Sequence, residues 1–583
     1  NCIRHHPKTD KRHPNHHHFV YNCNPNTKVI AALQPGKEIL RYEAMKSFGI
    51  CFTLGASVWQ GKYRGDAFRP PSPQSTVPSR FASPTFKRTK LYSTAARQKR
   101  ISSLVEWGNE NEIKVGGVGV QSMGEESGLG LVATQQVPSG SLVVTVPSKV
   151  ALSVESPSGG PDDVGVSDLV TDRRAFRDLP WYVQFSLYLY KLDKVSSTKL
   201  GIDFRPWLDS LPRQFDTPIH WTNTRQRDEL LQYQHMSESV DRQEKSWEEM
   251  YQKLQACTTG SSMTWDDFVW GCECARSRAF SGGYTGAPFN PLIYAFTLLL
   301  VTAYVGLSLG TLEQAANGAA LVFCASVLRD FVLPKFFRVK KYVICPVIDM
   351  CNHRSIGTTA NVAYEFFGDA YSLSTSLVSN DGEEIYISYG SRSNDQLLQY
   401  YGFVEQDNPS DVYIMPPLRE WDIAALEKAC GGPFAPGRLG KLERAGLLGK
   451  SADAPLEIDD DGLESAGNPR GGVVLTREGG IDPAVIQALR ALVSSDTEWE
   501  AAGEAVGNFA AEVSTENEKR ARLAARTAIE LELAAKATTI EEDKAILKRG
   551  QGSKSGLDPE KRLAIQFRIE KKKLLRDSID RLR

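Results

Sequence analysis

The sequence predicts an α+β protein with a strand-rich region at residues 101–415, followed by an all-α region at residues 416–583. Short runs rich in β-branched residues, such as residues 342–349, are typical of buried strands and occur in the first region. In the second region, apolar residues recur at helical spacing from residue 482 onward. The helices expected there are residues 483–493, 499–537, 538–549 and 558–582. A chain of 583 residues with 41% hydrophobic content can hold two or three domains with sizeable cores.

The overall charge and the cysteine pattern narrow the classes of function. The formal net charge is −1, which gives no electrostatic steering toward nucleic acid, and we expect no nucleic-acid partner. The ten cysteines are scattered, and only Cys272 and Cys274 lie close together. Because no second pair has the spacing of zinc ligands, we expect no metal site and interpret the cysteines as buried thiols.

Residues 1–100 are expected to be a disordered leader with a targeting address. An apolar run at residues 48–59 follows Met45 and has the length of a signal-peptide core. The sequence DAFRP at residues 66–70 is similar to the cleavage motif of plastid precursors in diatoms and related algae. Residues 69–100 contain no acidic residue but many basic residues, Ser and Thr, as transit peptides do. We therefore expect a complex plastid as the location. A disordered basic arm on a cytoplasmic protein is the alternative.

Two segments combine strand and turn signals with polar side chains. Residues 345–355, CPVIDMCNHRS, end a buried strand on a polar break. Residues 384–389 alternate as a strand does, and Gly390 then allows a sharp turn. Ser393 or Asn394 can cap the start of a helix over residues 395–401, and Gly402 can end that helix as a left-handed cap. This arrangement could present the Tyr389 phenol at the strand's end, although a lone tyrosine there is more often a core aromatic.

The combination of DxxNH at residues 349–353, YxxRSN at residues 389–394 and YGF at residues 401–403 resembles SET-domain methyltransferases. The resemblance is to the branch that includes the Rubisco large-subunit lysine methyltransferase and the actin-histidine methyltransferase. It implies a β-rich SET domain in which the Asn-His segment is threaded through a loop to form a pseudoknot. It also implies S-adenosyl-L-methionine as cofactor and a protein substrate that bears a target lysine.

The resemblance also assigns roles to single residues. Tyr389 would be the catalytic residue, because its hydroxyl would orient the amine and the departing methyl group. The implied cofactor-binding residues are Ser127, Gly128, Leu129, Arg278, Asn352, His353, Tyr389 and Phe403. The implied substrate-binding residues are Arg278, Asp349, Tyr364 and Tyr401. A general-base or metal-ligand role for His353 is a minor alternative, and the role of Arg392 stays open.

The remaining elements of the expected SET domain follow from shorter signals. The SGLG sequence at residues 127–130 resembles the family's first cofactor loop, where glycine lets the backbone approach a ligand. Residues 142–146 follow a turn at residues 138–140, which predicts a β-hairpin with the preceding strand.

A helical insert is expected at about residues 175–265, with helices at residues 179–193 and 225–256. Thr264 then begins a further helix with a capping-box-like sequence. That helix ends at SRAF, residues 277–280, which in the family lies beside the cofactor.

A second insert, at about residues 282–341, departs from the family pattern. Residues 291–310 carry no charge and have the length of a membrane-spanning helix, whereas residues 314–328 are more polar. One interpretation is a membrane hairpin or re-entrant anchor through residues 291–328, and the other is a water-soluble helical hairpin.

Two C-terminal stretches resemble the Rubisco methyltransferase substrate-binding domain. These are TTIEED at residues 538–543 and RLAIQFRIEKKKLL at residues 562–575. A helical bundle that docks a protein substrate is expected, with a purely stabilising cap as the alternative. The lysines of residues 571–573 are expected to form a solvated face.

Taken with the resemblance, the sequence predicts a monomeric, S-adenosylmethionine-dependent protein-lysine N-methyltransferase that acts on a non-histone protein, which could be a plastid protein. A protein-histidine N-methyltransferase is one alternative. A catalytically silent SET-fold scaffold is the other. The target protein and the number of methyl groups transferred are left open by the sequence.

Overall fold

The computed structural model describes most of the chain after the leader. The described residues are 94–583 except 125–127, 156–165, 195–200, 222–223, 260–261, most of 283–340, 366–368, 451–467, 504 and 552–556. All of them belong to one compact unit, Thr89–Arg583. The predicted address up to residue 93 and nearly all of the apolar insert lie outside the described residues and stay predictions, whereas residues 94–100 of the expected disordered leader begin a helix, α2 (Thr94–Glu110). Within the described part, none of the helices combines the length and apolar character that crossing a membrane requires.

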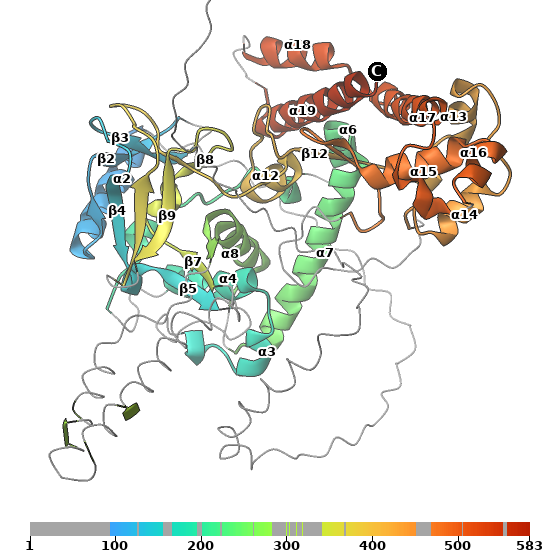
Figure 1. The fold of residues 1–583 in the computed structure, drawn as a ribbon. Helices are drawn as coiled ribbons and strands as arrows, with labels where there is room; N and C mark the ends of the chain where they lie inside the picture. Colours follow the sequence, from blue (N-terminus) through green and yellow to red (C-terminus); the bar gives the residue numbers. More distant parts are fainter. Residues whose placement is uncertain are drawn as a thin grey trace, which may run out of the picture. The chain divides into compact units, whose positions relative to one another are not determined.

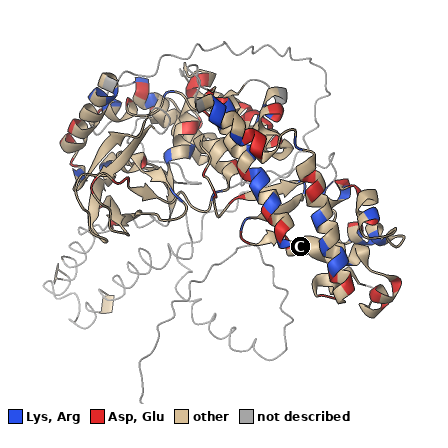
Figure 2. Cartoon of the chain, turned by 90° about the horizontal axis from the view of Figure 1, so that it is seen from above, with Lys and Arg blue, Asp and Glu red and all other residues tan. Residues whose placement is uncertain are grey.

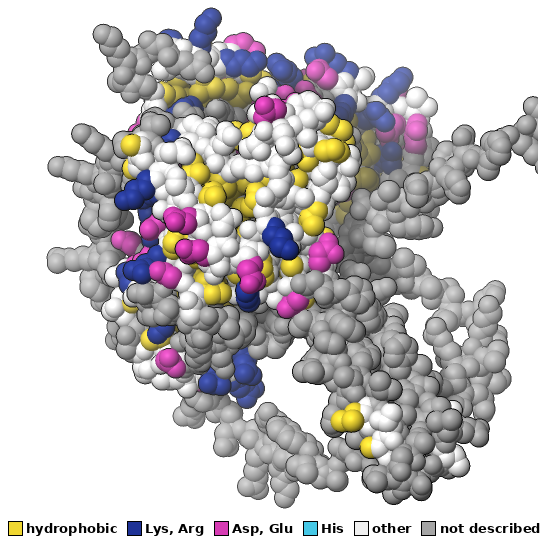
Figure 3. Space-filling view, turned by 90° about the vertical axis from the view of Figure 1, so that its left-hand side faces the viewer, with side chains coloured by type: hydrophobic (Ala, Val, Ile, Leu, Met, Phe, Trp, Pro, Cys, Tyr) yellow, Lys and Arg dark blue, Asp and Glu magenta, His cyan; other side chains and the backbone are white. Residues whose placement is uncertain are grey.

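The strand-rich region forms several small sheets beside the helix α2 (Thr94–Glu110), as Figure 1 shows. A four-stranded antiparallel sheet has the order β1-β4-β10-β9, and β5-β7-β6 form a second antiparallel sheet. The strands are β1 (Lys114–Val115), β2 (Val118–Ser122), β3 (Leu129–Ala133), β4 (Leu142–Pro147), β5 (Leu152–Glu155), β6 (Phe280–Gly282), β7 (Lys341–Ile344), β8 (Asn352–His353), β9 (Ala360–Glu365), β10 (Ala370–Thr375) and β11 (Tyr386–Ile387). The surface of this region in Figure 3 shows hydrophobic side chains between polar ones, with charged side chains of both signs.

The predicted hairpin of β3 and β4 is wrong. β3 pairs with β2, whereas β4 lies between β1 and β10. The reason lies in residues 137–140, whose backbone binds the end of β10 and the chain that follows it instead of closing a hairpin. Gly140 N donates to Thr375 O at 2.7 Å, and Val137 N donates to Ser379 O at 2.8 Å.

The helical insert packs against the sheets through α4 and α8. Gly271 in α8 allows the close approach, because a Cβ atom there would lie 2.7 Å from Ser186 Cα in α4. Thr264 caps α8 with the predicted capping box. The helices up to this point are α3 (Arg173–Arg177), α4 (Trp181–Lys194), α5 (Arg205–Leu208), α6 (Thr224–Leu231), α7 (Gln234–Ala256) and α8 (Trp265–Arg278). The buried free cysteines are Cys257, Cys272, Cys274, Cys345 and Cys351, as expected for buried thiols.

The single helix predicted at residues 225–256 is broken into α6 and α7. Gln232 adopts a positive φ of 52°, and Tyr233 is extended. The break directs Tyr233 into the C-terminal core, where its hydroxyl accepts a hydrogen bond from Ile414 N at 2.7 Å. A contact with a residue so distant in the sequence overrides the local helical pattern.

The C-terminal region is helical, as expected, but it also contains strands that the sequence analysis did not anticipate. Strands β12, β13 and β14 form a small antiparallel sheet. β13 and β14 are short and flanked by glycines, so the sequence there has too few consecutive strand-forming residues to indicate a strand. The helices and strands from residue 394 onward, of which the first two precede the C-terminal region, are α12 (Asn394–Tyr401), β12 (Val412–Met415), α13 (Ile423–Ala429), α14 (Arg438–Arg444), β13 (Val473–Thr476), β14 (Gly480–Ile481), α15 (Pro483–Val493), α16 (Asp496–Ala501), α17 (Thr515–Ala534), α18 (Ile540–Gln551) and α19 (Pro559–Arg581).

Two large hydrophobic cores hold these elements together, and a small third cluster of Ile540, Ile565 and Ile569 joins α18 to α19. The first fills the strand-rich region with α4 and α8. The second joins α15, α17 and α19 to residues of the helical insert, including Tyr233, Met236 and Val240. The insert therefore contributes to the core of the C-terminal region. Figure 2 shows acidic and basic side chains interspersed along the helices of this region.

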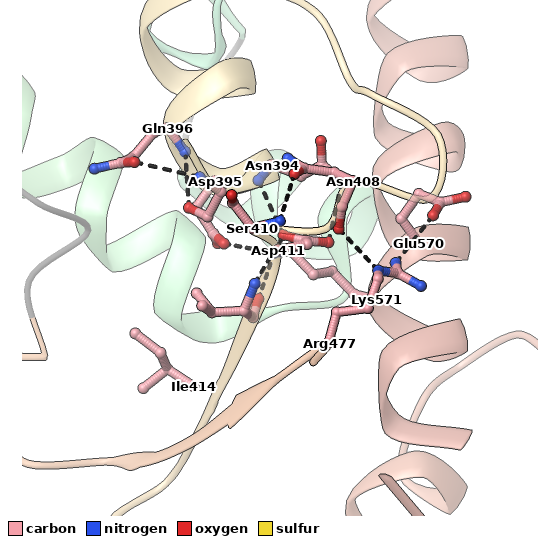
Figure 4. Close-up of polar contacts among 12 residues, drawn as sticks. Asn394, Asp395, Gln396, Asn408, Ser410, Asp411, Ile414, Arg477, Glu570 and Lys571 are labelled. Carbon is pink, nitrogen blue, oxygen red and sulfur yellow. Dashed lines mark hydrogen bonds and ion pairs between the residues drawn. The ribbon is translucent and has the colours of Figure 1, made fainter. Parts of the chain in front are cut away.

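The prediction of a solvated lysine face on α19 is wrong for two of its three lysines. Lys571 and Lys572 are each only 2% exposed. Figure 4 shows that Lys571 reaches the carboxylates of Asp395 and Asp411. Lys572 Nζ lies 2.8 Å from Asp543 Oδ2. The lysines are buried because α19 packs against several elements, among them α6, α12, α18 and β12.

A buried histidine near this core predicts a specific acid sensitivity. Burial and the nearby cations Arg242, Lys571 and Arg470 lower the pKa of His235 from 6.5 to about 3. Because the unfolded chain takes up this proton near pH 6.5 and the folded chain does not, folding stability falls as the pH drops below that value. Between pH 7 and pH 5, the wild type should lose roughly 2 kcal/mol more unfolding free energy than His235→Gln. Urea titrations of both proteins measure this difference, and parallel pH profiles would contradict it.

Candidate active site

The two segments singled out by the sequence lie side by side. β8 and β11 pair in parallel, with Asn352 opposite Tyr386 and His353 opposite Ile387. On its other side, the second segment binds β3, because Ile385 N donates to Leu131 O at 2.7 Å. Backbone pairing therefore brings three stretches that are distant in the sequence to one place.

An aromatic stack lies at this junction. The rings of His353 and Tyr389 are 5.0 Å apart and nearly parallel, and those of Tyr389 and Tyr401 are 4.9 Å apart. Phe403 contacts both His353 and Tyr401 with ring centroids 6.2 Å apart. The Tyr389 hydroxyl donates to Cys351 O at 2.8 Å, and Tyr389 N donates to His353 Nδ1 at 3.0 Å. Tyr389 is thus fixed at its ring, its hydroxyl and its backbone.

The protonation states of this stack follow from burial. Burial raises the pKa of Tyr389 well above its usual value, although Arg278 opposes the shift. Burial also raises the pKa of Tyr401, against Arg392 and Arg276. Burial lowers the pKa of His353, against the nearby Glu405. At neutral pH the two phenols are therefore protonated and the imidazole is neutral, so Tyr389 acts as a hydrogen-bonding group and not as a base.

The first glycine loop meets the Asn-His segment through a carboxylate. Asn352 Nδ2 donates to Glu384 Oε1 at 2.6 Å and lies 3.5 Å from Leu129 O. Gly128 has a positive φ of 67°, and a Cβ atom on Gly130 would lie 2.8 Å from Glu384 Oε1. Ser127 lies outside the described residues. The sequence analysis did not assign Glu384 to the site. The available signal was its position in the predicted strand at residues 384–389, directly before the buried Ile385.

Arg278 and Asp349 form a buried pair next to this junction. Arg278 Nη1 donates to Asp349 Oδ2 at 3.2 Å and to Asp349 O at 3.0 Å, and Trp207 Nε1 donates to the same carboxylate at 3.1 Å. The Asp349 side chain is fully buried, which raises its pKa despite the opposing charge of Arg278. Arg278 Nε and Asp349 Oδ1 are buried without a hydrogen-bond partner among the described residues. The pair therefore has bonding capacity left for a ligand.

Tyr364 is a predicted site residue, but its described contacts are with residues outside the aromatic stack. It is in β9, where its hydroxyl donates to Asp369 Oδ1 at 2.7 Å. Its ring lies 5.1 Å from that of Tyr371 on the neighbouring strand β10. The described contacts do not join Tyr364 to Tyr389, so its role at the substrate stays a prediction.

The donor set at the junction fits S-adenosylmethionine. The partnerless Nε of Arg278 suits the carboxylate of an amino acid, since guanidinium groups bind carboxylates well. The Gly128–Leu129 backbone and the Asn352 amide add polar groups, and the aromatic stack provides flat apolar surface for an adenine ring. We expect these residues to hold the cofactor.

Comparisons with known proteins find similar methyltransferases. Residues 432–575 match the family described as Rubisco LSMT substrate-binding. The chain is 24% identical over 467 residues to the chloroplastic fructose-bisphosphate aldolase-lysine N-methyltransferase of Arabidopsis thaliana, covering 77% of this chain and 76% of that protein. It is 23% identical over 539 residues to the chloroplastic Rubisco large subunit N-methyltransferase of Pisum sativum, covering 89% and 88%. The actin-histidine N-methyltransferase of Drosophila melanogaster is 25% identical over 309 residues, covering 52% and 48%.

Solved structures share the fold at low sequence identity. The structure of Rubisco LSMT bound to sinefungin and monomethyllysine matches with a TM-score of 0.52 and 19% identity, covering 83% of this chain and 91% of that chain. The SET domain of LSMT bound to lysine and AdoHcy matches over the same shares with a TM-score of 0.51 and 19% identity. The chain is therefore similar over most of its length to Rubisco large-subunit methyltransferases and shares the fold of their SET-domain structures, and residues 432–575 match the Rubisco LSMT substrate-binding family.

Proposed function

We propose that the protein is an S-adenosylmethionine-dependent protein-lysine N-methyltransferase that acts on a non-histone protein. The observation that carries the proposal is the position of Tyr389. Its ring lies against His353 and Tyr401, and its hydroxyl is held by Cys351 O where β3, β8 and β11 meet. A fixed phenol of this kind can orient an incoming amine.

The methyl transfer itself requires no general acid or general base in the site. S-adenosylmethionine supplies a methyl group on a sulfonium ion, which an uncharged amine can attack. A free lysine has a pKa of ~10.4, so its amine must lose a proton before it reacts. An apolar aromatic surrounding favours the uncharged amine, and holding it in line replaces an encounter in solution. Tyr389, Tyr401 and Phe403 provide such a surrounding.

The extent of the alignments favours lysine over histidine as the target. The aldolase-lysine and Rubisco enzymes align with 77% and 89% of this chain, whereas the actin-histidine enzyme aligns with 52%. The names of both lysine enzymes include the word chloroplastic, which supports a plastid protein as the target of this chain.

A methylation assay tests the proposed function. The full chain is incubated with methyl-labelled cofactor and plastid extract of an alga, and labelled proteins are analysed by mass spectrometry. Methylated lysine supports the proposal. Methylated histidine would favour the alternative enzyme class, and no label would favour a binding scaffold.

Cofactor binding can be checked without turnover. At a concentration 100 times the dissociation constant, S-adenosylhomocysteine should stabilise the folded chain by about 2.7 kcal/mol. Asn352→Ala should weaken this stabilisation, because the variant lacks the amide that binds Glu384 beside Leu129. Thermal unfolding and calorimetry measure both effects. The exposed variant Lys544→Met serves as control, and an absent shift in the wild type would contradict the cofactor assignment.

A further inference from the structure

The Glu405 carboxylate lies close to the His353 ring of the aromatic stack. Glu405 comes two residues after Phe403 and accepts two hydrogen bonds from Ser355. Ser355 N donates to Oε1 at 2.8 Å, and Ser355 Oγ donates to Oε2 at 2.6 Å. His353 Nε2 lies 3.1 Å from Ser355 Oγ and 3.6 Å from Glu405 Oε2.

The hydrogen bonds of His353, Ser355 and Glu405 fit the following placement of protons, with the Ile387 backbone as a further neighbour of the imidazole. The backbone N–H of Tyr389 can only donate, so His353 Nδ1 must be free of a proton to accept it. The neutral imidazole then carries its proton on Nε2 and donates to Ser355 Oγ. The serine hydroxyl points its own proton at Glu405, because a carboxylate can only accept. Glu405 therefore selects the tautomer that holds the Tyr389 backbone.

Glu405 is itself held by a buried side chain. Asn394, which is fully buried, accepts a hydrogen bond from Glu405 N at 2.9 Å and donates to Glu405 O at 3.0 Å. Asn394 Nδ2 also donates to Asp411 Oδ2 at 3.0 Å, and Lys571 Nζ lies 2.7 Å from Asp411 Oδ1. Figure 4 shows this part of the chain of contacts between α12 and α19.

We propose that Glu405 is a positioning residue for methyl transfer, which fixes the His353 tautomer and thereby Tyr389, and which Lys571 anchors through Asp411 and Asn394. The inference rests on the proposed function. Glu405 does not touch the reacting atoms, and it acts through Ser355 and His353. Lys571 in the C-terminal region thus helps to hold the site residues of the strand-rich region in place.

The variant Glu405→Gln tests the inference. Glutamine has the same shape, but its amide nitrogen would donate to Ser355 Oγ and turn the serine hydroxyl toward His353 Nε2. This reversal favours a proton on Nδ1, which cannot accept the Tyr389 N–H. We expect kcat to fall roughly 10- to 100-fold with little change in the KM of the cofactor, as when the partner that fixes a histidine is lost.

Nitrogen-15 NMR of histidine-labelled protein reads the tautomer directly. His353→Asn identifies the signal among the nine histidines. The wild type should show the proton on Nε2, and Glu405→Gln should show it wholly or partly on Nδ1. Glu383→Gln is the matched control. Glu383 is an exposed glutamate that binds Asn380 and precedes β11 in the chain.

The outcomes separate this inference from the proposed function. A wild-type proton on Nδ1 overturns the inference, and so does a Glu405→Gln variant with an unchanged tautomer and unchanged kcat. Neither result affects methyl transfer by the wild type. Failure of the extract assay would overturn the proposed function, while the tautomer still decides the hydrogen-bond arrangement because it needs no turnover.

Discussion

Tyr389→Phe is expected to lower kcat for methyl transfer roughly 100- to 1,000-fold, the range for losing one preorganised hydrogen-bonding group at a reacting centre. The variant keeps the ring against His353 and Tyr401 but loses the hydroxyl that Cys351 O holds. The fold should lose only about 1 kcal/mol, the usual net worth of one hydrogen bond. Single-turnover rates with labelled cofactor measure the effect on the chemical step.

Tyr251→Phe is the matched control for this experiment. Its hydroxyl also donates to a backbone carbonyl at 2.8 Å, that of Met263, in the helical insert. An equal loss of kcat in this control would point to general destabilisation. An unchanged kcat in Tyr389→Phe would remove Tyr389 from the catalytic role. Tyr364→Phe, assayed alongside, decides whether the predicted substrate role of Tyr364 holds.

Lys571→Met is expected to destabilise the folded chain by about 3–5 kcal/mol, the cost of leaving a buried charge without its partner. Lys571 is the buried cation between Asp395, Asp411 and the backbone oxygen of Val412. Burial raises the pKa of Asp395, and Lys571 opposes that shift. Without the lysine, two carboxylates would share an apolar site. Urea unfolding followed by tryptophan fluorescence measures the change.

A second substitution separates charge from packing in this experiment. Asp395→Asn in the Lys571→Met background should restore part of the lost stability, because it removes one of the unpaired carboxylates. Lys544→Met, on the exposed side of α18, should change stability by no more than about 0.5 kcal/mol. A loss below about 1 kcal/mol in Lys571→Met would show that the ion pairs are not needed for the fold.

Local signals in the sequence predicted some elements closely. The helix α12 lies where Ser393 and Gly402 indicated, with a capping box at one end and a left-handed residue at the other. The same holds for Thr264 at the start of α8. In these cases the residues that determine the structure are neighbours in the chain, so the sequence alone contains the necessary information.

Features that depend on distant partners could not be predicted in this way. The break before α7 follows from Tyr233 binding Ile414, which is 181 residues away. The buried lysines of α19 looked solvated because their acidic partners lie on other elements, and Asp395 is 176 residues from Lys571. In the site, the motif brought His353 and Tyr389 together correctly. Glu405 escaped notice because its contact with Ser355 spans 50 residues.

The burial of Lys571 against Asp395 and Asp411 has a consequence for protein engineering. A chimaera that takes its C-terminal half from a relative would place a foreign helix against an acidic pair that requires a lysine. Such a graft should fold well only when the donated helix carries a lysine at position 571 or when positions 395 and 411 are exchanged with it. The choice of a donor sequence is therefore limited by residues that lie outside the aromatic stack as well as by those within it.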